Sequence, residues 1–328
     1  NIGIAYSYNK MVELASNEIV CMLHSDMYVP PNFDKIMLSY MDKYDFITPL
    51  RVEPNVGYPE SVDKFLIDFG TKSEEFEENN FIKWSEQNAE TNQGRTEQRM
   101  FFPWMTTKKL YNDVGGNDEL FLKYMVDDDD FYLRIKMATD KYCQLFETAV
   151  YHMPSKSVRM REDGKVEINS QYNKSIRNFI RKWGVHPSSV WDDNRDMILP
   201  KKYDIGFVVR NCTEDLLKFL EPWCSTIYLS DAKMILNYSL EESNLTLYNM
   251  GKRVKKINFD EDGNVTEPSK LTNDILIQFD AIELNDDRVA FLQRLSDILT
   301  DSGAVGGMEY DVFKLSIKNL GWKSYEER

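Results

Sequence analysis

The chain has little cysteine, no long apolar run and a shortage of positive charge. Its four cysteines, Cys21, Cys143, Cys212 and Cys224, are widely spaced and form no CxxC pair, which disfavours a structural zinc site and a disulfide scaffold. We therefore expect a reducing, cytoplasmic setting. No stretch approaches the roughly 18–20 apolar residues of a membrane span, and no signal peptide is visible.

The charge balance restricts the possible partners. Lysine and arginine number 40 against 54 acidic residues, so the formal net charge is -14. Broad binding to nucleic acid or to an anionic membrane needs a basic surface, and this composition disfavours both. An anionic nucleotide remains compatible with it, because a bound metal ion can mediate that contact.

Length and patterning predict an α/β protein of two domains. With 328 residues, 42% of them hydrophobic, the chain is long enough to bury two ordinary cores. Strands alternate with helices on both sides of a linker at residues 186–202, which contains Pro187 and Pro200. We therefore expect one domain over residues 1–185 and a second, with a parallel sheet, over residues 203–328.

The predicted elements follow from apolar runs, turn residues and helical spacing. Predicted strands cover Ile19–Leu23, Asp45–Leu50, Gln144–Tyr151, Ile205–Val209, Thr226–Leu229, Leu245–Tyr248, Ile275–Phe279 and Ala304–Met308. Predicted helices cover residues 6–17, Phe33–Tyr44, Lys108–Asp113, 129–139, 170–184, Thr213–Trp223 and Arg288–Thr300. The polar stretch 51–100 predicts a helical insertion together with a mobile loop over Asn88–Glu97.

A first candidate site lies at His24-Ser25-Asp26, directly after the apolar run 19–23. A carboxylate just past a buried strand lies at the sheet edge where open α/β folds bind ligands. Mg²⁺ and Mn²⁺ prefer such oxygen ligands. The alternative is that Asp26 serves the turn before Pro30-Pro31.

A second candidate site is the run Asp127-Asp128-Asp129-Asp130. Adjacent carboxylates repel one another, which raises some of their pKa values and favours cation binding or proton uptake. The alternative is an acidic helix start that interacts with the helix dipole. The turn residues Gly115-Gly116 and the pair Asp118-Glu119 precede the run at close spacing and favour a functional site.

These motifs resemble the signature of family 2 glycosyltransferases with the A-type nucleotide-sugar fold. The resemblance rests on Gly115-Gly116-Asn117-Asp118-Glu119-x-Phe121-x-x-Tyr124-x-x-Asp127-Asp128-Asp129-Asp130-Phe131-x-x-Arg134. Upstream, Asn1-x-Gly3-x-Ala5-x-x-x-Asn9 and Ala15-x-x-Glu18-Ile19 resemble the helix before the family's metal-binding strand. The resemblance covers about residues 1–155 and implies a metal-dependent, inverting transfer of a sugar from a nucleotide diphosphate donor to a glycan or other hydroxyl acceptor.

On the donor side, the resemblance implies that Asp26 binds the Mn²⁺ or Mg²⁺ ion that bridges the donor diphosphate. His24 stands where the family has the first aspartate of its metal motif, and would touch the ribose or the metal. His152, at the end of a strand, either reaches the metal or diphosphate or is structural. The family's first strand and its base-reading aspartate would precede residue 1, so we expect a chain that lacks both.

On the acceptor side, the resemblance implies that Asp128 is the general base that deprotonates the acceptor hydroxyl. Asp127 is its acidic neighbour. Asp130 and Arg134 would hold the turn and helix in place behind Gly115 and Gly116.

The second domain resembles, more faintly, a Rossmann-like methyltransferase half. The strand from Asp204 to Val209 would be the first strand, and Asp231 would end the second. Arg210-Asn211-Cys212-Thr213 stands where a glycine-rich turn is expected, so the backbone cannot approach a cofactor closely. A degenerate binding or assembly domain and an S-adenosylmethionine-dependent methyltransferase are both open. A third possibility for the whole chain is a non-catalytic carbohydrate-binding or scaffold protein.

Overall fold

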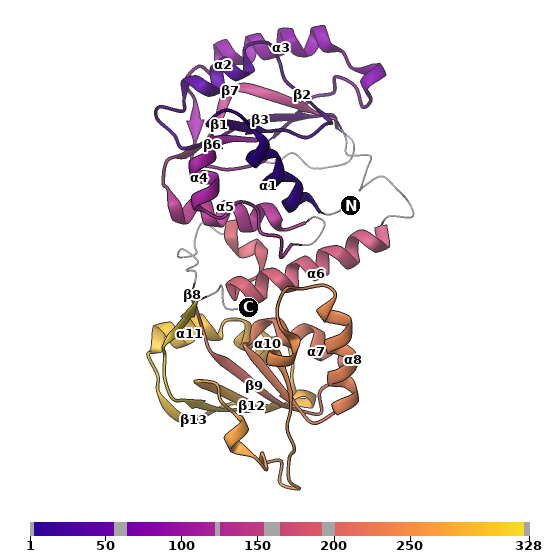
Figure 1. The fold of residues 1–328 in the computed structure, drawn as a ribbon, viewed down its shortest axis with the longest axis vertical. Coiled ribbons are helices and arrows are strands. Elements are labelled where there is room, and N and C mark those ends of the chain that lie inside the picture. The colour runs from indigo at the N-terminus through magenta and orange to yellow at the C-terminus, as the bar shows by residue number, and fades with distance from the viewer. Residues whose placement is uncertain (1–2, 56–63, 122–124, 154–164, 192–200, 325–328) are drawn as a thin grey trace. The chain divides into compact units, whose positions relative to one another are not determined.

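The computed structural model describes residues 3–55, 64–121, 125–153, 165–191 and 201–324, and it contains two α/β bodies (Figure 1). One compact unit consists of residues 1–119 and 123–171, and the other of residues 120–122 and 172–328. Each unit has its own sheet, of seven and six strands respectively. The prediction of an α/β protein with two such bodies is confirmed.

The first unit is built on a mixed sheet with helices on both faces. Its strands are β1 (Ile19–Met22), β2 (Met27–Tyr28), β3 (Phe46–Glu53), β4 (Lys64–Leu66), β5 (Thr96–Glu97), β6 (Trp104–Thr107) and β7 (Tyr142–His152). Its helices are α1 (Ile4–Leu14), α2 (Phe33–Ser39), α3 (Glu78–Thr91), α4 (Lys108–Asp113) and α5 (Asp127–Ala138). The sheet order is β1-β6-β3-β7-β2, with β4 on β3 and β5 on β7. Strand β3 runs parallel to β7 and β4, and the other pairs are antiparallel.

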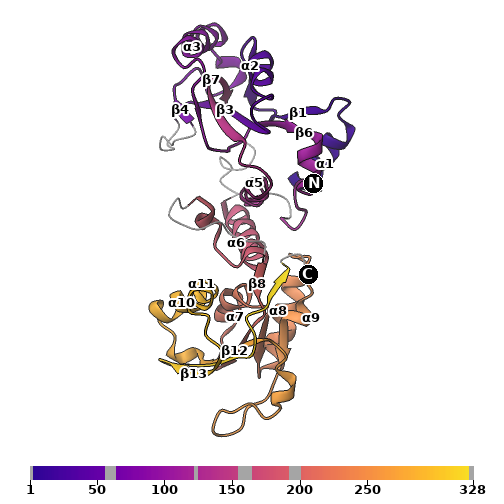
Figure 2. The same ribbon diagram turned by 90° about the vertical axis from the view of Figure 1, so that its left-hand side faces the viewer.

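Alternation along the strands decides which helices cover which face. Phe46 of β3 and Trp104 of β6 pack with residues of α1, α4 and α5. Their neighbours Ile47 and Met105 point to the opposite face and pack under α2. Further along the same face, α3 covers β3 and β7 through Phe81. Figure 2 shows α2 and α3 on one side of this sheet, and α1 and α5 on the other.

Most predicted elements of the first unit are present, with shifted ends. The predicted helix 6–17 begins at Ile4 and ends at Leu14, and the helix predicted to reach Tyr44 ends at Ser39. The prediction of a mobile loop over Asn88–Glu97 is wrong, because the last turn of α3 and strand β5 lie there. The amide of Asn88 is buried and donates to the Phe146 carbonyl at 2.7 Å, which holds this helix end against β7.

The second unit contains a six-stranded mixed sheet and a separate pair of strands. Its strands are β8 (Lys201–Tyr203), β9 (Ile205–Arg210), β10 (Thr226–Leu229), β11 (Val254–Lys256), β12 (Ile275–Asp280), β13 (Gly306–Tyr310), β14 (Phe313–Ile317) and β15 (Trp322–Ser324). Its helices are α7 (Glu214–Leu220), α8 (Ala232–Ser243), α9 (Met250–Arg253), α10 (Asp286–Gln293) and α11 (Leu295–Ser302), together with much of α6 (Lys165–Trp183). The order is β11-β10-β9-β12-β14-β13, and β8 pairs separately with β15.

Three predictions for this unit need correction. The predicted helix Arg288–Thr300 is two helices, α10 and α11, separated at Arg294. Strands β11, β10, β9 and β12 are parallel, but β14 runs antiparallel to β12, so the sheet is mixed rather than wholly parallel. No strand forms at Leu245–Tyr248, because the Leu245 amide bonds to Glu242 and the Tyr248 amide to the Thr246 hydroxyl in a turn. Asn249 then caps α9, and the third parallel strand is β11.

Helix α6 is tied to the second unit by a buried network of charges. Arg181 is fully buried and donates to the carboxylates of Glu221 and Glu242 at 2.5 and 2.8 Å. Arg177 holds Glu242 from the preceding turn, and Arg253 bonds to Glu221. The compact units therefore divide within α6, at residue 171, whereas the predicted linker 186–202 overlaps a 3₁₀ turn (Pro187–Trp191), residues outside the described ranges, and part of β8.

Across the described parts of the chain, no helix combines the length and the apolar character needed to cross a membrane.

Candidate metal centre and acidic helix start

Two histidines and one aspartate converge at one end of the first sheet. His24 and Asp26 lie in the loop between β1 and β2, and His152 is the last residue of β7. Strand β2 pairs with β7 in the register that places Met27 opposite His152, so the loop and the strand end meet. One ligand atom from each of the three groups lies within 4.8 Å of the other two. The structure thus brings together the three residues that the sequence placed on the donor side.

His152 is oriented by a carboxylate behind it. Its Nδ1 lies 2.7 Å from Glu53 Oε1, and its Nε2 faces Asp26 Oδ2 at 3.6 Å. Burial by itself would lower the pKa of His152, but the neighbouring carboxylates of Asp26 and Glu53 raise it above the ordinary value. A histidine that gives one ring N–H to a carboxylate and leaves the other nitrogen free is the usual arrangement of a metal ligand.

Glu53 is a site residue that the sequence did not identify. It ends β3, and its carboxylate is also held by Lys64 at 2.8 Å and Arg51 at 3.1 Å. Burial would raise the pKa of Glu53, but His152, Arg51 and Lys64 lower it to about 2, so the carboxylate is ionised at neutral pH. The sequence signal that could have identified Glu53 is its position at the end of a strand. Asp26 and His152 also lie at or just after strand ends.

His24 is a neutral imidazole in an aromatic pocket. Its ring stacks on Phe102 with ring centres 3.9 Å apart, and its Nε2 contacts the Tyr8 hydroxyl. Burial lowers the pKa of His24 to about 4. The neutral ring is the form in which histidine binds metals.

Asp26 carries the clearest sign of an unmet interaction. The neighbouring His152 ring lowers the pKa of Asp26, so this group is a carboxylate at neutral pH. Its Oδ1 atom is buried, yet it has no hydrogen-bond partner among the residues that the structure describes. A buried acceptor without a partner is costly, and a cation at this point would satisfy it. The donor set and this oxygen together fit a divalent metal ion.

The acidic run forms the first turn of α5, and its members differ in exposure. Asp127 and Asp130 are buried, whereas Asp128 is exposed. The two residues before the helix, Met125 and Val126, have φ angles of 79° and 66°. A β-branched residue with positive φ is strained, and such strain concentrates at functional sites. The predicted helix start at 129 lies two residues late, so all four aspartates are helical.

Tyr8 has neighbours both in the candidate metal centre and in the acidic turn. Burial raises the pKa of the Tyr8 hydroxyl, and the nearby charges of Asp127, Asp128 and Asp26 raise it further. Because the same hydroxyl contacts His24, the two clusters are neighbours around one side chain of α1. Nothing in the sequence pattern marks Tyr8, which looks like an ordinary apolar-face residue of its helix.

The Gly115-Gly116 turn is held by Asn9 and Tyr111. The Asn9 amide donates to the Asn117 carbonyl, and its oxygen accepts from the Asn117 backbone N–H, both at 2.9 Å. Gly116 has a φ of +64°, and a Cβ there would lie 2.5 Å from the Asn9 Oδ1 atom. Only glycine therefore fits this position without moving the Asn9 side chain.

Asp130 and Arg134 form a buried pair beneath this turn. The Arg134 Nε and Nη2 atoms donate to Asp130 Oδ2 at 3.0 and 2.7 Å. Arg134 Nη1 donates to the carbonyls of Val114 and Gly116. These contacts join the glycine turn to the first two turns of α5. Tyr124, another residue of the predicted motif, lies outside the described residues.

Replacing Asp127 with asparagine is expected to stabilise the fold, and the gain should grow with pH. Burial and then the charge of Asp128 raise the pKa of Asp127 to about 8. Between its ordinary pKa and that value, the folded chain keeps a proton that the unfolded chain releases, so stability falls as pH rises at up to about 1.4 kcal/mol per pH unit. Asparagine has no proton to lose.

Urea unfolding at pH 5 and pH 8 measures this difference. The exposed Asp140→Asn variant is the control and should show no such pH-dependent gain. An equal effect of Asp127→Asn at both pH values would contradict the raised pKa.

At the carboxyl ends of β9 and β12 in the second unit, side chains bond to one another. Arg210 Nη2 lies 3.3 Å from Asp280 Oδ2, and the Asn211 amide donates to the same oxygen at 2.8 Å. Arg210 also packs so closely on Gly263 that a Cβ there would lie 1.9 Å from its Nη1. Asp231 accepts two backbone N–H groups in the first turn of α8 and so serves as its N-cap.

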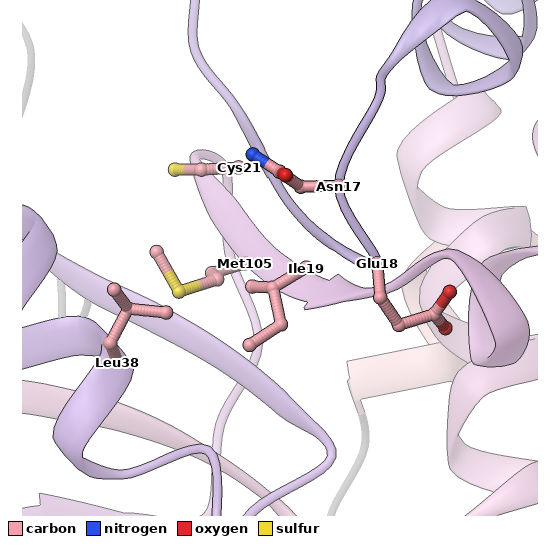
Figure 3. A pocket seen from close by; sticks show the side chains of 6 residues that line it. All are labelled: Asn17, Glu18, Ile19, Cys21, Leu38 and Met105. Carbon is pink, nitrogen blue, oxygen red and sulfur yellow. The ribbon is translucent and has the colours of Figure 1, made fainter.

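A hollow of about 420 Å³ lies beside β1, and its lining includes none of the three residues of the candidate metal centre. Ile19, Cys21, Leu38 and Met105 line it, and the Glu18 carboxylate lies on the side away from Leu38 (Figure 3). Glu18 instead accepts the Lys109 backbone N–H at 3.1 Å. Its lining offers a single carboxylate and a single thiol, so we place no reaction there.

A scan against models of protein families and a search of curated proteins found no match to this chain.

Proposed function

We propose that this chain is a metal-dependent, inverting glycosyltransferase that moves a sugar from a nucleotide diphosphate donor to a hydroxyl acceptor such as a glycan. The observation that carries the proposal is the group His24, Asp26 and His152, which lies next to the acidic start of α5 around Tyr8. The ordered sequence motifs supply the reaction class. On this proposal the first unit has the A-type nucleotide-sugar fold.

The donor side is assigned to the metal centre. Asp26 and His152 would hold the ion, with Glu53 fixing the ring of His152. A divalent ion bound there would offset the charge that develops on the leaving diphosphate. Arg51, whose Nε lies 3.1 Å from Glu53 Oε1, adds a positive charge close to the same centre.

The acceptor side is assigned to the acidic turn. The acceptor oxygen attacks the anomeric carbon while the bond from that carbon to the diphosphate oxygen breaks. The hydroxyl proton passes to the Asp128 carboxylate, and the nucleoside diphosphate leaves with the electron pair. One exposed base and a single displacement imply inversion at the anomeric carbon. Asp127 is buried, and burial together with the charge of Asp128 raises its pKa, so it is assigned to supporting the turn and not to taking the proton.

Donor turnover tests the proposal directly. Nucleoside-diphosphate sugars are incubated with oligosaccharide acceptors and Mn²⁺ or Mg²⁺, and the released nucleoside diphosphate is measured. We expect release that needs both acceptor and metal, and a product of inverted anomeric configuration by NMR. Asp26→Ala should lower turnover by at least about tenfold, since even an outer-shell ligand change costs that much.

The exposed Asp42→Ala variant is the matched control and should keep full turnover. Unchanged turnover in Asp26→Ala would exclude Asp26 from the site. Saccharide binding without any donor turnover would favour the alternative of a non-catalytic carbohydrate-binding or scaffold protein.

For the second unit we propose a Rossmann-like fold that has a binding or assembly role. The order β11-β10-β9-β12 corresponds to strands 3-2-1-4 of a doubly wound sheet, which supports the fold. Arg210 and Asn211 both bond to Asp280 where a cofactor would lie, and Asp231 is used as a helix cap. Calorimetry with S-adenosylmethionine tests the methyltransferase alternative, and binding of this cofactor would favour that alternative.

A further inference from the structure

We propose that the centre formed by His24, Asp26 and His152 is built for a divalent transition-metal ion rather than for Mg²⁺, with His24 as a third protein ligand. The inference concerns the same site as the proposed function and rests only on its metal-binding part. It assigns to His24 a role in ion selection that the neighbouring carboxylate alone could not fill.

The first argument is the rarity of the residues that meet. The chain has three histidines in 328 residues, and two of them converge on the same aspartate from distant parts of the sequence. A histidine packed only for its ring needs no carboxylate or second imidazole beside it. Here the Asp26 Oδ1 atom is buried and lacks a hydrogen-bond partner within the described ranges.

The second argument is the orientation of the two rings. His152 uses Nδ1 for Glu53, which leaves Nε2 on the side of Asp26. His24 uses Nε2 for Tyr8, and no described residue bonds to its Nδ1. In the tautomers that donate the Nδ1 proton of His152 to Glu53 and the Nε2 proton of His24 to the Tyr8 oxygen, each ring keeps one nitrogen lone pair for a cation, which is how metal-ligating histidines are supported.

The third argument is the chemistry of the donor set. Two imidazoles and one carboxylate suit borderline ions such as Fe²⁺, Co²⁺ and Zn²⁺, whereas Mg²⁺ prefers oxygen ligands in near-octahedral geometry. Two ligand atoms on one such ion lie about 3.0–3.5 Å apart, and His152 Nε2 and Asp26 Oδ2 are 3.6 Å apart. With a histidine at position 24, the centre also offers one negative charge instead of two, which weakens its hold on a hard cation.

Cobalt titration tests the inference in the absence of any nucleotide sugar. Visible absorption of Co²⁺ reports nitrogen ligands directly, and added Mg²⁺ measures the preference. We expect one Co²⁺ per chain that Mg²⁺ in about 100-fold excess does not displace. His24→Ala should weaken Co²⁺ binding at least about tenfold, and His24→Asp should let Mg²⁺ compete. His186→Ala removes the remaining histidine and should change nothing.

The outcomes separate the metal inference from the proposed function. Displacement of Co²⁺ by comparable Mg²⁺, or unchanged binding in His24→Ala, overturns the inference even where sugar transfer is observed. Selective Co²⁺ binding without turnover of any nucleotide sugar leaves the inference standing and removes the proposed function. Should His24→Ala fail to fold, His24→Asp decides, because it keeps a ligand atom and must shift the preference toward Mg²⁺.

Discussion

On the proposed function, replacing Asp128 with asparagine is expected to lower the rate of sugar transfer by about 10²–10⁴-fold, the usual contribution of a general base. The asparagine side chain keeps the size of the carboxylate but cannot accept the acceptor's proton. Asp128 is the exposed member of the buried–exposed pair at the start of α5, so of these two carboxylates it is the one open to an acceptor hydroxyl. Initial rates at saturating donor and acceptor measure the loss.

Asp127→Asn is the matched control for this experiment. Burial raises the pKa of Asp127 to about 8, so its side chain is already neutral at pH 7 and an amide imitates it. We expect Asp127→Asn to transfer sugar at a rate close to that of the parent chain. Loss of transfer in Asp127→Asn with full transfer in Asp128→Asn would exchange the two assigned roles.

The second large effect concerns stability. Glu221→Gln is expected to lower the free energy of unfolding of the second unit by about 3–5 kcal/mol at pH 7, the usual cost of breaking a buried ion pair. Glu221 is fully buried and accepts hydrogen bonds from Arg181, Arg253 and the Tyr238 hydroxyl. Its replacement leaves two buried guanidinium groups facing a neutral amide.

The pH dependence of this effect has a definite sign. Burial would raise the pKa of Glu221, but the charges of Arg181 and Arg253 outweigh burial and lower it to about 2. A carboxyl with a lowered pKa stabilises the fold above its ordinary pKa near 4.5, and this contribution is lost as pH falls toward 2. The difference between the parent chain and Glu221→Gln should therefore shrink below about pH 4.

Urea unfolding monitored by circular dichroism measures the loss, with the two units followed as separate transitions where they unfold separately. Asp311→Asn is the control, because it removes an equivalent carboxylate from an exposed pair with Arg288 in the same unit. It should leave the transition in place. A small effect of Glu221→Gln at pH 7 would mean that the network rearranges to satisfy its arginines.

Local sequence patterns were sufficient to predict many of the individual strands and helices. Strand Thr226–Leu229 and helix Lys108–Asp113 have the predicted bounds, because each is a short apolar or helical run between clear turn residues. Leu245–Tyr248 failed for the opposite reason. It is apolar enough for a strand, but capping by Asn249 and a turn at Leu245 use its backbone groups differently.

Some residues of the candidate site could likewise be predicted from local sequence patterns, and others could not. His24, Asp26 and the four aspartates were visible in the sequence because they form compact motifs next to predicted elements. Tyr8 and Glu53 were not, since each looks ordinary within its own helix or strand. Their importance comes from neighbours contributed by the β1–β2 loop, β7 and α5, which no local pattern contains.

Periodicity and turn chemistry act over a few residues, so the α/β class, the two bodies and the two acidic clusters could be predicted from local patterns. How the clusters are completed depends on contacts between distant parts of the chain. The pairing of Met27 with His152 brings a histidine from the far end of β7 to Asp26, and Tyr8 of α1 links that centre to Asp127 and Asp128. Burial then separates the acidic pair into a buried Asp127 with a raised pKa and an exposed Asp128, since the cost of burying charge depends on packing and not on residue type.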